Sequence, residues 1–189
     1  TAVWSSVNTA IGQSALNVST SSRNTAVGNS ALVNLLYPNG GDSRNTAIGE
    51  AAMQNTTYGY YNTAVGETAL YSNTTGYFNT AFGTQAGYLN TTGHDNIYMG
   101  VLAGYKDSAG ANTNITGNYN IIIGPNQNMI PDAAASNQLN IGNLIFGTGI
   151  QTGSTLSTGY VGIGTSTVPS VLTIAIPTAG GGDANGVRL

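Results

Sequence analysis

Few residues in this chain have the types and the spacing that catalysis requires. The only histidine, His94, lies beside Asp95, and a carboxylate that orients an imidazole can make it a general base. A structural interpretation competes with this one, because His94 stands at the place where neighbouring sequence repeats carry Tyr60 and Tyr77. Analogy with those repeats favours a turn residue over a catalytic base.

Two carboxylates, Glu50 and Glu67, are seventeen residues apart. If each repeat forms one turn of a stack, they lie one above the other, about 5 Å apart at the strand spacing. Such a pair suits acid chemistry or a cation site, but two solvated carboxylates beside Arg44 is the favoured interpretation. The sequence contains no Asp-x-Asp-x-Asp-Gly calcium loop.

The glycine-rich stretches do not fit phosphate-binding patterns. In GVLAGYK, residues 100–106, three residues separate the glycines and Lys106 does not directly follow the second one, whereas a P-loop needs four residues and an immediate Lys. The glycines at 162–164 and 180–182 follow strand-like or loop sequence without a helix to open. We therefore expect no catalytic, cofactor or metal site, and no enzyme activity.

Composition and charge exclude several other classes of protein. Only 6% of the 189 residues are charged, against about a quarter in typical globular proteins. The net charge is −3 and the four cations form no cluster, so nucleic acid is not an expected partner. There is no Cys, hence no disulfide or thiolate site. The longest apolar run, near 120–124, is too short to span a bilayer, so membrane insertion is not expected either.

A short phrase, Asn-Thr-Ala-apolar-Gly, recurs along the chain, and its closing glycines are 16, 21, 17, 17, 17 and 24 residues apart. This spacing predicts an all-β fold: a parallel β-solenoid, that is a β-roll or β-helix, of about nine short coils. The predicted divisions are a repeat solenoid over 1–135, degenerate terminal coils over 136–176, and a Gly-rich tail or linker over 177–189. The phrase begins at Asn8, Asn24, Asn45, Asn62 and Asn79, and weaker copies begin at Asn96 and Asn120.

Substitutions within the repeat predict which side chains face inward. The second and fourth positions change from Thr63 and Val65 to Ile97 and Met99, and a spacing of two indicates a strand. Since Ile replaces Thr at the second position, we expect both positions to face the packed interior. A second apolar phrase, such as TAL at 68–70, predicts another strand, and NTTG at 73–76 predicts a turn.

Such a coil buries too little apolar surface to be stable alone, because ordering each backbone residue costs roughly 1–2 kcal/mol. Recurring aromatic residues are expected to cover a seam between chains. An intertwined or side-by-side homotrimer, with its axis along the stack, is the simplest closed arrangement. The aromatic residues are Tyr60, Tyr61, Tyr71, Tyr77, Phe78, Tyr88, Tyr98 and Tyr105.

The phrases NTAVGETAL and YSNTTG, residues 62–76, resemble the repeats of phage tail fibres, and the NTA(I/V)G units are similar to the β-roll heads of trimeric autotransporter adhesins. SNQLNIGNLIFGT (136–148) and YVGIGTSTVPSVLTI (160–174) resemble the stretch that precedes an endosialidase-type intramolecular chaperone. In that family the chaperone trimerises the fibre and then cuts itself away by Ser/Lys chemistry. This sequence lacks the chaperone, so no catalytic residue carries over. The resemblance implies an extracellular trimeric fibre segment, on a virion or a cell surface, used for host or surface attachment.

Other functions stay open on the sequence alone. A bacterial cell-surface adhesin or a self-assembling extracellular filament can be built from the same coil. An ice-binding solenoid is a third hypothesis, since the threonines at 9, 25, 46, 63 and 80 form a regular ladder. The replacement of this ladder by Ile97 and Ile121 indicates that it points inward, which disfavours ice binding.

Two insertions, 33–45 and 104–118, break the repeat length. Recognition surfaces tend to lie on such loops, although loops that only shield the seam are the favoured interpretation. A cell-surface glycan or a protein receptor is the expected ligand, because aromatic faces stack on sugars and amides bond their hydroxyls. The expected contacts are Leu35, Leu36, Tyr37, Arg44, Lys106, Asp107, Asn112 and Asn114.

Overall fold

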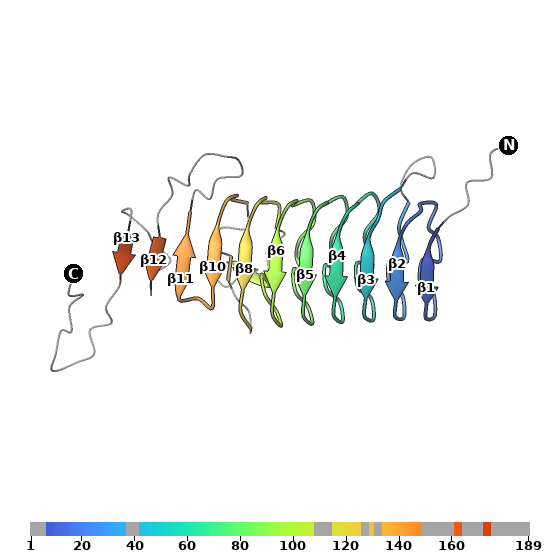
Figure 1. Ribbon diagram of the computed structural model, residues 1–189, viewed down its shortest axis with the longest axis horizontal. Coiled ribbons are helices and arrows are strands. Elements are labelled where there is room, and N and C mark those ends of the chain that lie inside the picture. Colours follow the sequence, from blue (N-terminus) through green and yellow to red (C-terminus); the bar gives the residue numbers. More distant parts are fainter. Residues whose placement is uncertain are drawn as a thin grey trace.

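The fold is a stack of short parallel strands. A computed structural model describes residues 7–36, 42–107, 115–125, 129–130, 134–148, 161–163 and 172–174, and these residues contain strands and turns but no helix. Eight parallel strands follow one another along the stack, with seven turns of solenoid between them (Figure 1). They are β1 (Thr9–Ile11), β2 (Thr25–Val27), β3 (Thr46–Ile48), β4 (Thr63–Val65), β5 (Thr80–Phe82), β6 (Ile97–Met99), β8 (Ile121–Ile123) and β10 (Leu139–Ile141).

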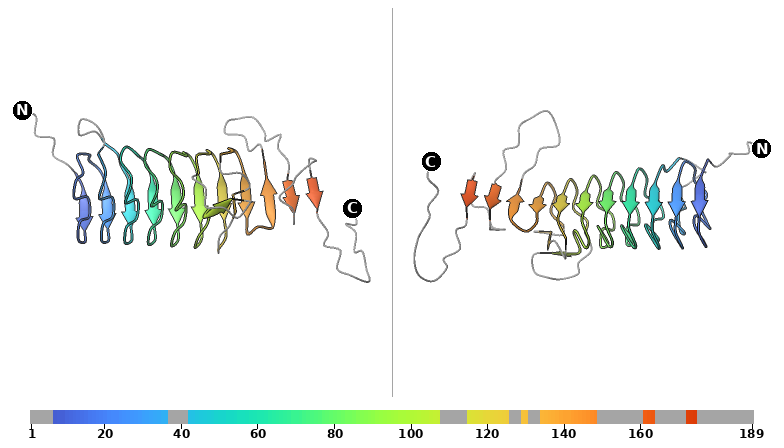
Figure 2. Two further views of the ribbon diagram at one scale, coloured as in Figure 1. Left: turned by 180° about the vertical axis from the view of Figure 1, so that it is seen from behind. Right: turned by 60° about the horizontal axis from the view of Figure 1, so that its bottom comes forward.

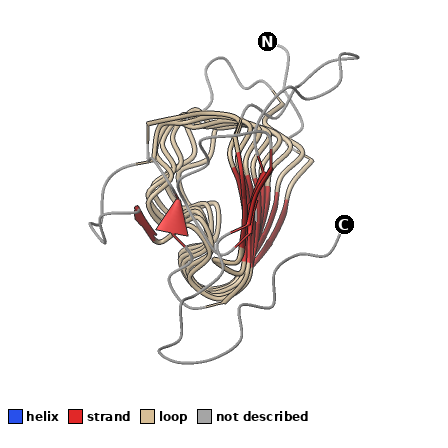
Figure 3. Ribbon diagram, turned by 90° about the vertical axis from the view of Figure 1, so that its left-hand side faces the viewer, coloured by secondary structure: helices blue, strands red, loops and turns tan. Residues whose placement is uncertain are grey.

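The predicted all-β parallel solenoid is confirmed, and the sequence repeat sets its register. Each strand pairs with the next so that equivalent letters of the phrase lie side by side, as Thr46 pairs with Thr63 and Ala47 with Ala64. Viewed along the stack, the strands form one wall and the turns form the others (Figure 3). The described coils make seven turns, against about nine expected over the whole sequence.

Each of the first five coils contains one strand, not the two that we expected. After the closing glycine the chain turns, and Thr68 and Leu70 both have a φ of 50°. Their backbone N–H groups still bond to the adjacent coils: Thr68 donates to the Glu50 carbonyl at 2.8 Å and Leu70 to the Ala86 carbonyl at 2.9 Å. The hydrogen-bond ladder therefore continues around the coil, but positive φ values bend the chain out of strand geometry.

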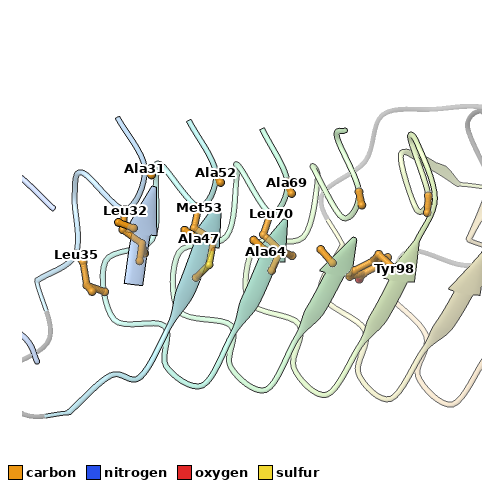
Figure 4. Close-up of a cluster of buried hydrophobic side chains, with 14 of the residues drawn as sticks. Ala31, Leu32, Leu35, Ala47, Ala52, Met53, Ala64, Ala69, Leu70 and Tyr98 are labelled. Carbon is orange, nitrogen blue, oxygen red and sulfur yellow. The ribbon is translucent and has the colours of Figure 1, made fainter. Parts of the chain in front are cut away.

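The interior of the solenoid is narrow. In the coil that begins at Asn62, Ala64, Ala69 and Leu70 are fully buried (Figure 4), whereas the side chains of Thr63 and Val65 point outward. The expectation that the second and fourth positions face the interior is therefore wrong. Alternation along the strand is real, but the set that faces in is the third position of the phrase, which is alanine in β2 to β5 and a larger buried side chain, such as Tyr98 or Ile122, in later coils.

Buried asparagines join the coils. The backbone N–H of Asn62 donates to Oδ1 of Asn45, and that of Asn79 donates to Oδ1 of Asn62, both at 2.9 Å. The amide Nδ2 of Asn62 also donates to the carbonyl of Gly76 at 2.8 Å. A buried amide costs little when its hydrogen bonds are made. The asparagine that begins each repeat thus connects neighbouring coils by hydrogen bonds.

The closing glycine of each phrase is required by close approach. Gly66 has a φ of 136°, and a Cβ there would lie 2.5 Å from backbone atoms of Gly83. The carbon would overlap the next coil, and an L side chain rarely adopts this φ. Coils can therefore stack at strand spacing only if this position stays glycine.

The direction of the strands reverses at the C-terminal end of the stack. After β10 the chain reverses through Gly142, Asn143 and Leu144 into β11 (Ile145–Gly147), which is antiparallel to β10. Two further strands extend the same sheet: β12 (Val161–Ile163), antiparallel to β11, and β13 (Leu172–Ile174), parallel to β12. The predicted degenerate coils over 136–176 therefore begin with one true coil strand and continue as a hairpin. Residues 177–189 lie outside the described residues.

A second, two-stranded sheet lies on the side of the solenoid away from the main sheet (Figure 2). It pairs β7 (Lys106–Asp107) with β9 (Met129–Ile130) in parallel. The longer insertion therefore contacts a segment from the following coil.

Candidate interaction surface

The outward side chains of the parallel strands form two straight columns, which we call the strand face. The second-position column begins with threonines and ends with aliphatic residues, and the fourth-position column is apolar in every coil. The pairing of each strand with the next places equivalent residues side by side. The columns are Thr9, Thr25, Thr46, Thr63, Thr80, Ile97, Ile121 and Leu139, and Ile11, Val27, Ile48, Val65, Phe82, Met99, Ile123 and Ile141.

The strand face carries no charge and is partly exposed along its length. Phe82 is 57% exposed and Met99 46%. Seven strand spacings of about 4.8 Å give the apolar column a length of roughly 34 Å. A continuous exposed apolar strip of this kind is typical of a protein–protein or other binding surface and is uncommon on a surface that contacts only water. Sequence reasoning missed this surface, although an apolar residue before every closing glycine was the signal.

Aromatic rings form a ladder at the corner that precedes β4, β5, β6 and β8. Tyr60 stacks on Tyr77 with centroids 4.8 Å apart, and Tyr77 stacks on His94 at 4.5 Å. Tyr61 and Phe78 stack beside them at 5.1 Å. The rings cover one another's faces along the ladder, while Tyr61 and Phe78 are exposed at 40% and 47%.

The other predicted aromatic residues also pack within the chain. Tyr71 and Tyr88 stack at 5.0 Å. Tyr98 is fully buried, so it cannot cover a seam between chains, and burial raises the pKa of its hydroxyl far above the usual range. Its hydroxyl donates to Oδ1 of Asn90 at 3.2 Å.

His94 belongs to the aromatic ladder, as its place in the repeat predicted. Its Nδ1 lies 2.8 Å from Oδ2 of Asp95, and its ring meets Tyr119 edge-on at 5.3 Å. The imidazole is thus held between Tyr77 and Tyr119 as one more stacked ring.

Charged residues gather at the same corner in the earlier coils. Asp42 lies 2.9 Å from Arg23 and 3.1 Å from Arg44, and it accepts a 2.7 Å hydrogen bond from the Ser22 hydroxyl. This hydrogen bond first, and the two guanidinium groups with it, hold the pKa of Asp42 below its usual value. Arg44 also lies over the Tyr61 ring, 5.3 Å from its centroid.

The two carboxylates that were candidates for an acid pair, Glu50 and Glu67, are exposed. Their exposure fits two solvated carboxylates, and Arg44 forms its ion pair with Asp42. Among the described residues, no three His, Asp or Glu side chains gather in a way that could hold a metal ion. No helix in the described ranges is long and apolar enough to cross a membrane.

Of the residues expected to contact a receptor, the five that the structure describes lie in different parts of the fold. Leu35 is fully buried, so its expected exposure is wrong, while Leu36 is exposed at 43%. Arg44 lies at the charged corner. Lys106 and Asp107 form β7 on the far side from the strand face (Figure 3). The other three, Tyr37, Asn112 and Asn114, lie outside the described residues.

Comparisons with known proteins give no relatives. The chain matches no protein-family model, and neither a curated protein nor a solved structure is similar to it. The strand face and the geometry of the coils are therefore the basis for a function.

Proposed function

We propose that this chain is a structural and adhesive fibre segment: a homotrimeric β-solenoid that forms the shaft or head of a phage tail fibre or a similar extracellular surface fibre. The observation that carries the proposal is the uncharged strand face, whose apolar fourth-position column continues from Ile11 to Ile141. A single chain in water leaves this strip exposed.

Other copies of the chain are the partner that this surface fits best. A copy has the same repeat spacing, so its columns can follow these columns coil by coil, and neither surface has a charge to desolvate. The sixteen side chains of the two columns approach the 20–30 residues a side of a typical stable interface. A three-fold axis parallel to the stack lets the strand face of each chain meet both other chains, one along each edge of the face, because a three-fold interface joins two different patches.

The hydrogen-bond pattern favours side-by-side chains over intertwined ones. Successive coils of one chain bond to each other around the turns as well as along the strands, for example from Thr74 to the Thr91 carbonyl at 2.8 Å. Each described coil thus completes its ladder with its own chain. The seam is then the strand face, and the aromatic ladder stabilises each chain.

In this proposal, attachment to a host or surface is made either by another part of the fibre or by the two insertions of this segment. A bacterial cell-surface adhesin or an extracellular filament subunit would use the same trimer, and a cell-surface glycan or protein stays the proposed ligand class. Binding of the intact protein to a glycan array tests this part: specific binding supports a receptor role, and a blank array at high protein concentration argues for a spacer.

Sedimentation velocity over a wide concentration range tests the assembly. We expect an elongated species with three times the chain mass. A monomer at every concentration contradicts the proposal. An Ile48→Asp/Ile123→Asp variant, which places a charge at two points of the seam, should sediment as a folded monomer.

Ice binding is the second candidate, because one observation now favours it. The threonine column points outward from β1 to β5, with Thr63 and Thr80 exposed, contrary to the inward ladder that we expected. Regular hydroxyl and methyl groups on a sheet can match a crystal lattice. The column ends at Ile97, however, while the apolar column continues, so the seam explains more of the surface.

Thermal hysteresis of the wild type and of Thr63→Lys separates these functions. If the protein binds ice, the wild type should show a measurable difference between the melting and freezing temperatures of ice, and Thr63→Lys should abolish that difference. A trimer that uses this surface as its seam gives no gap.

A further inference from the structure

The strand face has two different halves. From β1 to β5 each coil presents one threonine and one apolar side chain. From β6 onward both columns are apolar: β6, β8 and β10 present Ile97 with Met99, Ile121 with Ile123, and Leu139 with Ile141. The change occurs at one coil, so the apolar density per coil doubles there.

Side chains around the C-terminal half enlarge the same patch. Val101, just after β6, is 45% exposed, and Leu144, in the loop after β10, is 56% exposed. Phe82, at the boundary between the halves, is the most exposed apolar residue of the strand face after Ile11. Apolar side chains therefore occupy both columns from β6 to β10 and one column from β1 to β5, where Ile11 is exposed at 60%.

We propose that copies of the chain associate mainly through this C-terminal half, and that the threonine-bearing half aligns the chains while adding little affinity. The inference rests on the proposed trimer and names the part of its seam that holds it together.

The physical reason is desolvation. Aliphatic side chains gain about 25 cal/mol for each Å² removed from water, whereas a threonine hydroxyl loses its water and needs a new partner. Binding energy also concentrates where apolar anchors are ringed by other apolar groups that exclude water. Ile141 has Leu139 and Ile123 as such neighbours, while Ile48 has Thr46 in the adjacent column.

A lipid surface fits this patch less well than another copy of the chain. Stable adsorption to a membrane usually combines an apolar face with nearby Lys or Arg, and neither column of the strand face contains a cation. The straight, evenly spaced columns match a partner with the same repeat.

A matched pair of variants in the full-length chain tests the inference. Ile48 and Ile141 are the same residue at the same position of the phrase, with exposures of 39% and 37%. We expect Ile141→Asp to raise the chain concentration at half-dissociation of the trimer at least about tenfold more than Ile48→Asp does. Circular dichroism confirms that each variant is folded.

A second variant keeps the test decisive if Ile141→Asp does not fold. Ile97→Thr/Ile121→Thr gives β6 and β8 the pattern of the first five coils, and it should weaken the trimer about tenfold or more. Val27→Thr/Ile48→Thr, the same kind of change in the threonine-bearing half, should weaken it less than threefold. Equal effects at the two ends overturn the inference but leave the trimer intact, and a wild type that never associates overturns both.

Discussion

The coils of β3 to β5 and those of β6 to β10 follow the same path with different contents. In the first group the inward strand position is alanine, as in Ala64, and in the second it is Tyr98, Ile122 or Asn140, all fully buried. The outward second position changes at the same place, from threonine to isoleucine. The comparison teaches that the backbone hydrogen-bond ladder and the buried asparagines define the coil. The inward and outward side chains of the strand can be replaced by others without a change in the path of the chain.

The larger inward side chain of β6, Tyr98, is accommodated by a smaller residue in the preceding coil. Where other coils have a leucine such as Leu70, the next coil has Gly87. A Cβ at Gly87 would lie 2.6 Å from Cδ2 of Tyr98 and 2.9 Å from Cδ2 of Leu70. The Tyr98 ring therefore occupies the volume that a side chain at position 87 would need.

The largest expected effect comes from a charge inside the second group. Ile122→Asp places a carboxyl in a fully buried apolar site without a partner, which should lower the free energy of unfolding by about 4–5 kcal/mol. Ile123→Asp is the control, because the next side chain along β8 points outward. It should keep the fold and disrupt only association, as followed by circular dichroism and urea unfolding. Equal loss of structure in both contradicts the inward assignment.

The next largest effect is expected where the backbones of neighbouring coils approach closely. It should distinguish a glycine inside the stack from one in the hairpin at the C-terminal end. Gly66→Ala combines an unfavourable φ with a Cβ 2.5 Å from the next coil, for an expected loss of about 3–4 kcal/mol in urea unfolding. Gly142 also has a positive φ, but nothing lies within 4 Å of its added Cβ. Gly142→Ala should therefore cost about 1 kcal/mol. Similar costs at the two sites show that coil spacing does not require the glycine.

A double-mutant cycle tests the exchange between Gly87 and Tyr98. Gly87→Ala should lower the free energy of unfolding by about 2–3 kcal/mol, since the methyl group meets the Tyr98 ring and φ is 62°. In a Tyr98→Ala background the ring is gone, so the same substitution should cost about 1 kcal/mol less. Additive costs in thermal or urea unfolding indicate that Tyr98 does not fill this space.

The repeat made most of the architecture predictable. Glycine spacing gave the parallel stack, its register and the turn at residues such as Asn73, whose Nδ2 bonds the Gly76 carbonyl at 3.1 Å. The facing of the strand was not predictable in the same way. A period of two identifies two sets of side chains, and the choice between them depends on how close the walls of the coil lie.

The candidate surface was harder to predict than the fold. Its signal, the apolar residue before each glycine, was present in the sequence, but we assigned it to the interior. Leu35 was placed on an exposed loop because its repeat is long, yet it is buried in the core. Sequence alone does not tell at which residue an insertion leaves the coil, since this depends on packing against the neighbouring coil.

The smallest expected effect concerns the corner beside the strands, where the early coils carry Arg23, Asp42 and Arg44 and the later ones carry Tyr119 and Asn137. The pKa of Asp42 lies below its usual value of 3.8. A carboxyl with a lowered pKa in the folded state stabilises the fold above its unfolded pKa, and this contribution is lost as the pH falls through the folded pKa. The wild type should therefore lose more thermal stability than Asp42→Asn between about pH 6 and about pH 3. Because the groups are exposed and screened, the difference should be small and should shrink in high salt. Identical pH profiles of the melting temperature in the two proteins would show that the Asp42 carboxylate and its two arginines do not stabilise the early coils.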